Sequence, residues 1–134
     1  MTSGFDPIIS LLIEIKNAHL SGASSIEIRH SKYREGVLET LSKMNLLTYR
    51  VFKDEGGSFK KIHVDLSQDS NSRRRMLGIH FYSKPGRRIY GNSTRLKFMM
   101  SKSQAGVVIS TSKGVFSIRD AVKKNLGGEL LFRV

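Results

Sequence analysis

Hydrophobic residues near the start of the chain recur with the spacing of an amphipathic helix. The helix should begin at Asp6-Pro7, because the aspartate side chain can accept a backbone N–H and proline suits the first helical position. The apolar residues that follow lie at i, i+3, i+4 and i+7, namely Ile8, Leu11, Leu12 and Ile15. The pattern predicts a helix over about residues 6–20.

A second amphipathic pattern follows a short alternating segment. Ile26–Arg29 alternates apolar and polar residues, as a short strand does. Ser31 is a suitable N-cap for a helix, and Asn45 stands where a left-handed residue commonly ends one. The apolar residues between them share one helical face: Val37, Leu38, Leu41 and Met44.

Two later runs alternate hydrophobic and polar residues on either side of Gly56-Gly57, which is typical of a β-hairpin. Residues 1–66 are therefore expected to form an N-terminal lobe of order α-β-α-β-β. The apolar members of the two runs are Leu47, Tyr49, Val51, Ile62, Val64 and Leu66.

Residues 67–72 carry no apolar group, and we expect them to connect this lobe to a second one, because Ser, Asn and Asp favour local side-chain-to-backbone bonds. Residues 73–134 should form a mainly β lobe with one short helix capped by Ser117. Its strands are expected at 76–82, 88–90, 107–110 and 130–134, and no element is predicted for 91–106. The expected fold class is α+β, with two small lobes.

The basic residues are unevenly divided between these lobes. The chain has 23 Lys and Arg against 11 Asp and Glu, a net charge of +12. Residues 1–66 hold 9 basic and 8 acidic residues, whereas residues 67–134 hold 14 and 3. A concentrated basic excess is typical of a surface that binds phosphates. A charge that only maintains solubility is the alternative, but a dispersed excess would serve that purpose as well.

The sequence favours neither catalysis nor a metal or cofactor site. There is no cysteine, the four histidines do not form a ligand pair on one helical face, and neither the P-loop nor the Gly-x-Ser-x-Gly spacing occurs. No membrane segment is expected either. The longest apolar stretch, Ile8–Ile15, is interrupted and far shorter than the roughly 20 residues that span a bilayer.

Candidate RNA-binding chemistry is densest at the end of one apolar strand. There, three hydroxyl groups suit base edges and 2′-hydroxyls, an ammonium group suits phosphate, and a glycine permits close backbone approach. A polar turn without function is the alternative interpretation. The residues are Ser110, Thr111, Ser112, Lys113 and Gly114.

Cations gather at two other places. Lys84 and Arg88 flank a Pro85-Gly86 turn, with Tyr90 two residues beyond, which suits phosphate contact and base stacking. The alternative for Tyr90 is a half-buried strand residue. The densest run of charge is Arg73, Arg74 and Arg75, for which a solvated face is the alternative.

Three patches of residues occur in the order and spacing found in a known family. The resemblance runs nearly from end to end of the chain. They are Asp6-Pro7-Ile8 with Lys16-Asn17-Ala18, Ser83-Lys84-Pro85-Gly86 with Arg88-Ile89-Tyr90, and Ser110-Thr111-Ser112-Lys113-Gly114 with Gly127-Gly128-Glu129. In these patches the chain resembles the small-subunit ribosomal protein S-eight family, the eighth protein of the bacterial-type small subunit.

This resemblance implies a structural, non-enzymatic protein of the ribosome, in a bacterial cytoplasm or an organelle with a bacterial-type ribosome. Its expected partners are the central domain of small-subunit ribosomal RNA, neighbouring small-subunit proteins and, in bacteria, its own mRNA. A nucleic-acid-binding protein acting off the ribosome is the alternative, and a small hydrolase is a third hypothesis. The family's pattern implies that the following residues contact RNA: Ser110, Thr111, Ser112, Lys113, Tyr90, Gly128, Glu129, Lys32, Lys84, Arg88, Lys16 and Asn17.

Overall fold

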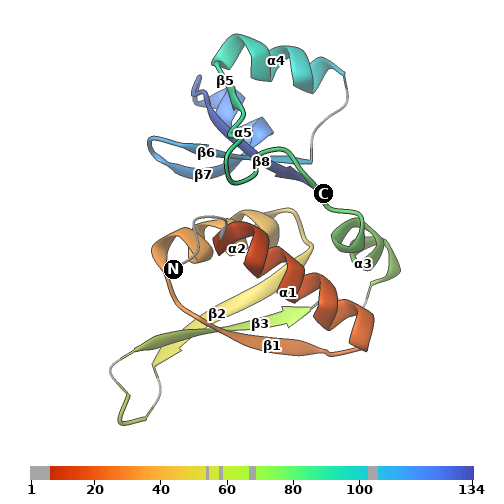
Figure 1. Ribbon diagram of the computed structural model, residues 1–134, viewed down its shortest axis with the longest axis vertical. Coiled ribbons are helices and arrows are strands. Elements are labelled where there is room, and N and C mark those ends of the chain that lie inside the picture. The colour runs from red at the N-terminus through yellow and green to blue at the C-terminus, as the bar shows by residue number, and fades with distance from the viewer. Residues whose placement is uncertain (1–6, 54, 58, 67–68, 103–105) are drawn as a thin grey trace. The chain divides into compact units, whose positions relative to one another are not determined.

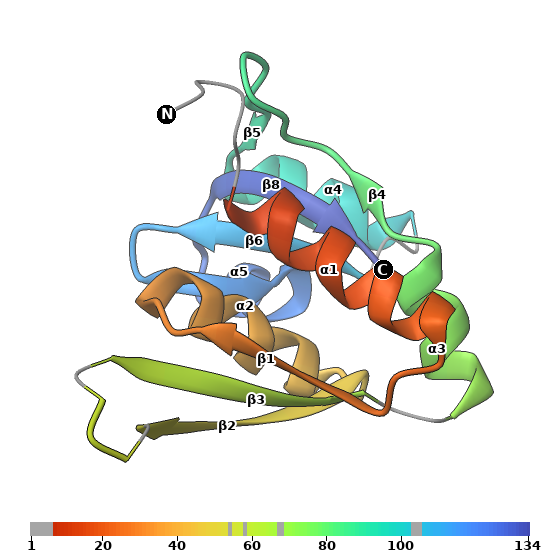
Figure 2. The same cartoon turned by 60° about the horizontal axis from the view of Figure 1, so that its bottom comes forward.

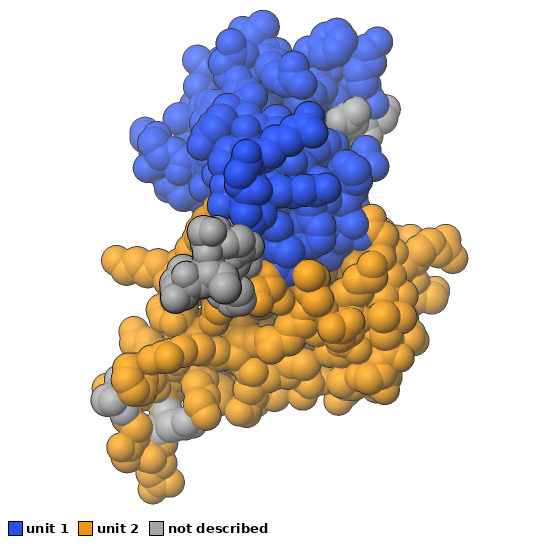
Figure 3. Space-filling model, in the orientation of Figure 1, with its two compact units in different colours: residues 1–9, 79–134 blue, residues 10–78 orange. Residues whose placement is uncertain are grey.

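The computed structural model describes residues 7–53, 55–57, 59–66, 69–102 and 106–134. Its helices and antiparallel sheets form an α+β fold, which confirms the predicted class (Figure 1). The chain divides into two compact units, an N-terminal unit of residues 10–78 and a C-terminal unit of residues 79–134 together with residues 1–9 (Figure 3). Each unit has its own sheet.

The N-terminal unit is built on a three-stranded antiparallel sheet. Its central strand is β3 (Lys60–Leu66), which pairs with β1 (Ser25–Arg29) on one side and β2 (Leu47–Lys53) on the other. Helix α2 (Lys32–Lys43) and most of α1 (Pro7–Ser21) cover one face of the sheet (Figure 2). The two predicted helices, the short strand and the hairpin are thereby confirmed.

The apolar faces predicted from the sequence pack together to form the core of this unit. Leu12 and Ile15 of α1, Leu38 of α2, and Ile62 and Val64 of β3 are almost fully buried. Burying one such side chain contributes about 1.5–3 kcal/mol relative to leaving it in water. The periodic apolar positions therefore supply the main stabilising interaction of the N-terminal unit.

The ends of α2 follow from their local sequence. The Ser31 side chain accepts a hydrogen bond from the backbone N–H of Arg34 at 3.1 Å, as expected of an N-cap. Asn45, just beyond the helix, has a φ of 62°, in the left-handed region that the sequence predicted there. Asp6, the expected cap of α1, lies outside the described residues.

The expectation that residues 67–72 form an irregular connector followed by a strand at 76–82 is wrong in two respects. Helix α3 spans Ser70–Leu77, and only His80–Phe81 of the expected strand is extended, as β4. The Asp69 side chain accepts the backbone N–H of Ser72 at 3.1 Å, so residues 69–72 are a helix cap and a first turn, while residues 67–68 lie outside the described residues. Fully buried Met76 anchors the helix in the core.

In the C-terminal unit, β8 (Gly128–Arg133) is the strand to which three others pair. The strand order is β4-β8-β6-β7, and β5 also pairs with β8. The remaining strands and helices are β5 (Tyr90–Gly91), β6 (Val107–Thr111), β7 (Gly114–Ser117), α4 (Ser93–Ser101) and α5 (Ile118–Lys123). Their core consists of Leu96, Met99, Val107, Ile109, Ile118, Ala121 and Leu130.

Two elements of this unit differ from the sequence prediction. The strand expected at 88–90 is reduced to β5, because the backbone N–H of Ile89 bonds to the Ser83 hydroxyl instead of to a strand. Helix α4 occupies part of the stretch for which nothing was predicted. Its Asn92 cap is regular, but Phe98 in its middle is 62% exposed, so the helix lacks a clean apolar face. Helix α5 begins after Ser117, as predicted.

Near its end, α1 buries the imidazole ring of a histidine. His19 is 4% exposed, and its Nε2 atom has no hydrogen-bond partner among the described residues. A guanidinium N–H of Arg73 donates to the His19 carbonyl oxygen at 3.0 Å, which joins α3 to α1. Burial, and secondarily the charge of Arg73, lower the pKa of His19 from its ordinary value of 6.5.

The first prediction concerns stability in mild acid. Above pH 6.5 His19 is neutral in the folded and unfolded chain alike, so it adds no pH dependence. Below pH 6.5 the unfolded chain binds a proton that the folded chain does not, so the free energy of unfolding falls, by up to about 1.4 kcal/mol per pH unit. His19→Leu should remove this contribution, as measured by urea unfolding at about pH 7.5 and about pH 5.5.

Exposed His80 provides the matched control. His80→Gln should keep the pH dependence of the natural protein, whereas His19→Leu should flatten it. An equal loss of stability between the two pH values in the natural chain and in His19→Leu would contradict the assignment to His19.

Candidate nucleic-acid interface

The hydroxyl-rich segment forms the tip of the β6–β7 hairpin. Thr111 pairs with Gly114 in the strand register, which leaves Ser112 and Lys113 as the two loop residues. The Thr111 hydroxyl accepts the backbone N–H of Lys113 at 3.1 Å and donates to the Gly114 carbonyl at 2.8 Å. Gly114 has a φ of 129°, which strongly favours glycine. Thr111 and Gly114 therefore build the turn, while the exposed side chains of Ser112 and Lys113 are presented to solvent.

Two glycines allow the neighbouring strand to approach this hairpin. A Cβ atom on Gly128 would overlap the carbonyl oxygen of Ser110 and lie 3.1 Å from the Cα of Thr111. A Cβ on Gly127 would lie 2.6 Å from the carbonyl oxygen of Gly91 in β5. Only glycine fits at both positions without a backbone shift. The pair therefore holds β8 between the hairpin and β5.

Three side chains form a row across β5, β8 and β6. Glu129 lies opposite Tyr90 on one side and opposite Ser110 on the other. Residues directly opposite in an antiparallel pair project from the same face of the sheet, so an aromatic ring, a carboxylate and a hydroxyl line up. Tyr90 is 67% exposed, which rules out the alternative of a half-buried strand residue. An Arg88 guanidinium nitrogen lies 3.4 Å from a Glu129 carboxylate oxygen.

The Pro85-Gly86 turn is tied to the same strand. The backbone groups of Lys84 and Arg87 exchange hydrogen bonds of 3.0 and 2.9 Å, and Gly86 has a φ of 82°, as a type II turn requires. The anchor of this turn is Ser83, a residue that was not predicted from the sequence. Its buried hydroxyl donates to the Leu130 carbonyl at 2.6 Å and accepts the Ile89 N–H at 3.0 Å. A serine before Pro-Gly gave no signal of burial, because serine is mostly exposed in proteins.

The remaining predicted site residues belong to the N-terminal unit. Lys16 and Asn17 are exposed on α1, and Lys32 is exposed at the first position of α2. The three arginines of α3 differ in their surroundings. Arg73 and Arg74 are both exposed and Arg75 is half-buried, but only Arg73 bonds to the His19 carbonyl oxygen.

The charge of the C-terminal unit suits a polyanion. Residues 79–134 hold 11 basic and 2 acidic residues, of which one acid, Glu129, lies beside the hairpin. Among the residues that the structure describes, no group of three or more His, Cys, Asp or Glu side chains could hold a metal ion. Within the same ranges no helix has the length and apolar character needed to cross a membrane.

Comparison with known proteins identifies the family. A family model described as Ribosomal protein S8 matches residues 6–134. The chain is 36% identical to the small ribosomal subunit protein uS8 of Kosmotoga olearia, over 94% of this chain and 95% of that protein. It is 34% identical to the protein of the same name from Lachnoclostridium phytofermentans, over 94% of each chain. These matches confirm the resemblance seen in the sequence, and the chain belongs to the ribosomal protein S8 family, whose members are structural components of the small ribosomal subunit and not enzymes.

Proposed function

We propose that this protein binds the central domain of small-subunit ribosomal RNA and supports assembly of the subunit. The observation that carries the proposal is the surface where the exposed hairpin tip, Ser112 and Lys113, adjoins the row of Tyr90, Glu129 and Ser110. We name it the hairpin surface. It lies within residues 79–134, which hold 11 basic and 2 acidic residues.

The hairpin surface combines groups that can contact bases and sugars with cations that attract the RNA phosphates. The exposed Tyr90 ring can stack on an unpaired base, and the Ser110 and Ser112 hydroxyls can bond to base edges or 2′-hydroxyls. The Glu129 carboxylate repels phosphate and accepts hydrogen bonds only, so it favours base amino groups and sugar hydroxyls as its neighbours. Lys113 and Lys84 supply charge for the RNA backbone.

Further contacts in the proposal extend beyond the hairpin surface. Lys32, Lys16 and Asn17 are exposed and able to meet RNA from the N-terminal unit, and Arg88 meets the backbone beside Glu129. Pro85 and Gly86 shape the turn that presents Lys84. The names of the relatives, small ribosomal subunit proteins, support contact with neighbouring ribosomal proteins as part of the proposal.

Repression of the protein's own mRNA is a further part of the proposal. A surface that recognises irregular RNA by shape and hydroxyl contacts accepts any transcript that folds into the same shape. An mRNA that copies the ribosomal site would therefore compete for the hairpin surface. General nucleic-acid binding off the ribosome is the alternative, and the basic composition alone supports it equally well.

The second prediction tests the proposed function. In a sucrose gradient of a cell lysate the protein should sediment with small ribosomal subunits, and the purified chain should prefer the central-domain rRNA fragment over duplex DNA of equal length. The hydroxyl-rich hairpin tip suits irregular RNA better than a regular groove, which explains the preference. Equal affinity for the two at matched salt, or sedimentation apart from the subunits, would favour the alternative.

The third prediction assigns selectivity to Ser112. Ser112→Ala removes no charge and leaves the Thr111 bonds of the turn in place, so the hairpin should keep its shape. Affinity for the rRNA fragment should fall by about 1–3 kcal/mol because an RNA group loses its partner on binding, while random RNA should bind as before. Filter binding of both RNAs at matched salt measures this.

A charge variant at the neighbouring position is the control for Ser112. Lys113→Ala should weaken both RNAs and reduce the slope of log affinity against log salt by about 1. If Ser112→Ala weakens both RNAs together, or neither, Ser112 is not a specificity element.

The fourth prediction separates the arginines of α3. Arg74→Ala should lower affinity for rRNA and random RNA alike and reduce the salt slope by about 1, because an exposed cation can neutralise one phosphate. Arg73→Ala should instead lower the free energy of unfolding, because Arg73 bonds to the His19 carbonyl. Salt titrations and urea unfolding give the two readouts.

Lys43 serves as the control for Arg74, because it is an exposed cation of the N-terminal unit that pairs with Glu39 at 3.8 Å and has no place in the proposed site. Lys43→Ala should leave the salt slope unchanged. An unchanged slope in Arg74→Ala as well would remove α3 from the proposed RNA contacts.

A further inference from the structure

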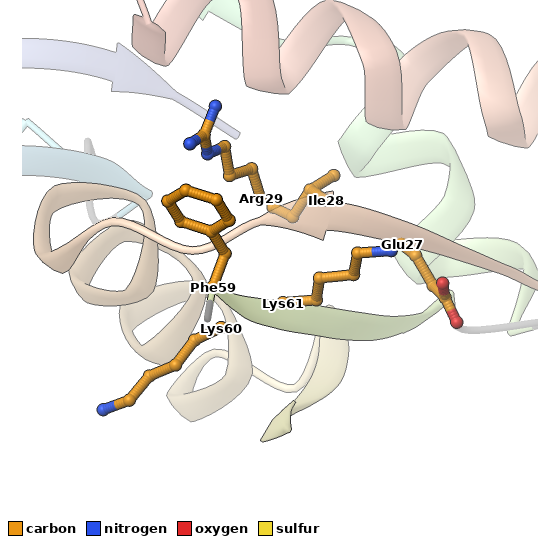
Figure 4. A pocket seen from close by; sticks show the side chains of 6 residues that line it. All are labelled: Glu27, Ile28, Arg29, Phe59, Lys60 and Lys61. Atoms are coloured by element: carbon orange, nitrogen blue, oxygen red, sulfur yellow. The ribbon is translucent and has the colours of Figure 1, made fainter. Parts of the chain in front are cut away.

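A concave site lies in the N-terminal unit where the end of β1 meets the start of β3 (Figure 4). Its volume is about 420 Å³, within the range of about 300–1,000 Å³ typical of sites for small organic groups. None of its residues belongs to the hairpin surface or to the other predicted RNA contacts. It is lined by Glu27, Ile28, Arg29, Phe59, Lys60 and Lys61.

The central feature of this site is an exposed aromatic ring with a cation on it. Phe59 is 61% exposed, and the guanidinium carbon of Arg29 lies 4.6 Å from the centre of its ring. Figure 4 shows the guanidinium group of Arg29 over the ring. A phenyl group in water is unfavourable, and Arg29 leaves most of this one uncovered. The uncovered surface of Phe59 can accept a second flat group.

Cations of all three strands gather at this end of the sheet. The register places Arg29 opposite Lys61, and Lys60 opposite Lys53 of β2. Among the lining residues only Glu27 carries the opposite charge, and Figure 4 shows Lys61 extending along β3 towards it. Arg29 is exposed on the side of Phe59 and attracts anions there. Lys60 and Lys53 are also exposed but project from the other face of the sheet, because successive strand residues alternate, so they add positive charge only from a distance.

We propose that this site binds one unpaired nucleotide of an RNA chain, with its base stacked on Phe59 and its phosphate held by Arg29. A nucleic-acid strand carries a flat aromatic ring on every charged unit, so it matches both the phenyl ring and the cation. Stacking accepts any base, so the contact is independent of sequence. The inference rests on the proposed function only in taking RNA as the polyanion.

An acidic peptide is the competing occupant. The cations would attract its carboxylates, but a carboxylate has no flat ring to extend the layered stack of guanidinium and phenyl groups. A peptide would also gain little from Phe59 unless it carried an aromatic residue at the matching position. The stacked pair therefore favours a nucleotide.

The test is an NMR titration of the ¹⁵N-labelled full-length chain, because backbone amide shifts report the two surfaces separately. A short oligouridylate should shift the amides of Arg29, Lys60 and Lys61 in a saturable way. Phe59→Ala should weaken the affinity obtained from these amides by about 5- to 150-fold, the range for loss of one stacked base. Phe59→Tyr keeps the ring and should bind like the natural chain.

Phe98 is the matched control, because it is also exposed, at 62%, and has Lys102 at 5.4 Å, but lies on α4 of the C-terminal unit. Phe98→Ala should leave the affinity at Arg29, Lys60 and Lys61 unchanged. An oligoglutamate peptide is added in a separate titration and should bind more weakly at these amides, with no dependence on Phe59.

Three results would overturn the proposal: no shift of these amides when the oligouridylate is in excess, equal affinity in Phe59→Ala, or tighter Phe59-dependent binding of the peptide. The central-domain rRNA fragment serves as the second probe. If it shifts the amides of Ser112 and Lys113 while the oligouridylate fails at Arg29, only this inference is wrong. If it shifts no amide of the hairpin surface, the proposed function fails independently.

Discussion

The hairpin surface depends on one close backbone approach, that of β8 at Gly128 to β6 at Ser110. A side chain at Gly128 would overlap the Ser110 carbonyl oxygen, so any larger residue would separate the two strands. The register that aligns Tyr90, Glu129 and Ser110 exists only while this approach holds. The glycine thus acts through geometry, by bringing together three side chains that are far apart in the sequence.

The same strand also positions the groups around that row. Buried Ser83 links the Pro-Gly turn to the carbonyl of Leu130, so the turn that presents Lys84 is fixed to β8 as well. Thr111 bonds within its own hairpin and leaves Ser112 and Lys113 for a ligand. Backbone contacts and small buried hydroxyls therefore build the scaffold, and only a few exposed groups remain for recognition.

The N-terminal unit uses its polar residues differently. Arg73, one of three adjacent arginines, joins α3 to α1 through the carbonyl of His19, whose buried Nε2 atom has no hydrogen-bond partner among the described residues. At one end of the sheet, Arg29 covers part of Phe59 instead of forming an ion pair within the lining of the site. Basic residues that are close together in the sequence thus have different roles: some bond to other groups of the protein, and others stay exposed on its surface.

Residue pattern and charge alone determined much of this protein. The apolar periodicity of α1 and α2 and the alternation of apolar and polar residues in β2 and β3 specified the N-terminal unit. In each of these elements the apolar residues gather on one face, which makes the element recognisable from its sequence. The three motif patches indicated the family, and the density of hydroxyl groups at residues 110–112 marked the hairpin as a candidate RNA contact.

Tertiary structure decided the features that arise from contacts between distant residues. Helix α3 looked like a connector because its capping Asp69 and first-turn serines are also turn formers, and only burial of Met76 selects the helix. Helix α4 exposes Phe98 and packs through few apolar residues, so its pattern was not visible. The row of Tyr90, Glu129 and Ser110 and the stack of Arg29 on Phe59 follow from strand register, which short-range periodicity does not encode.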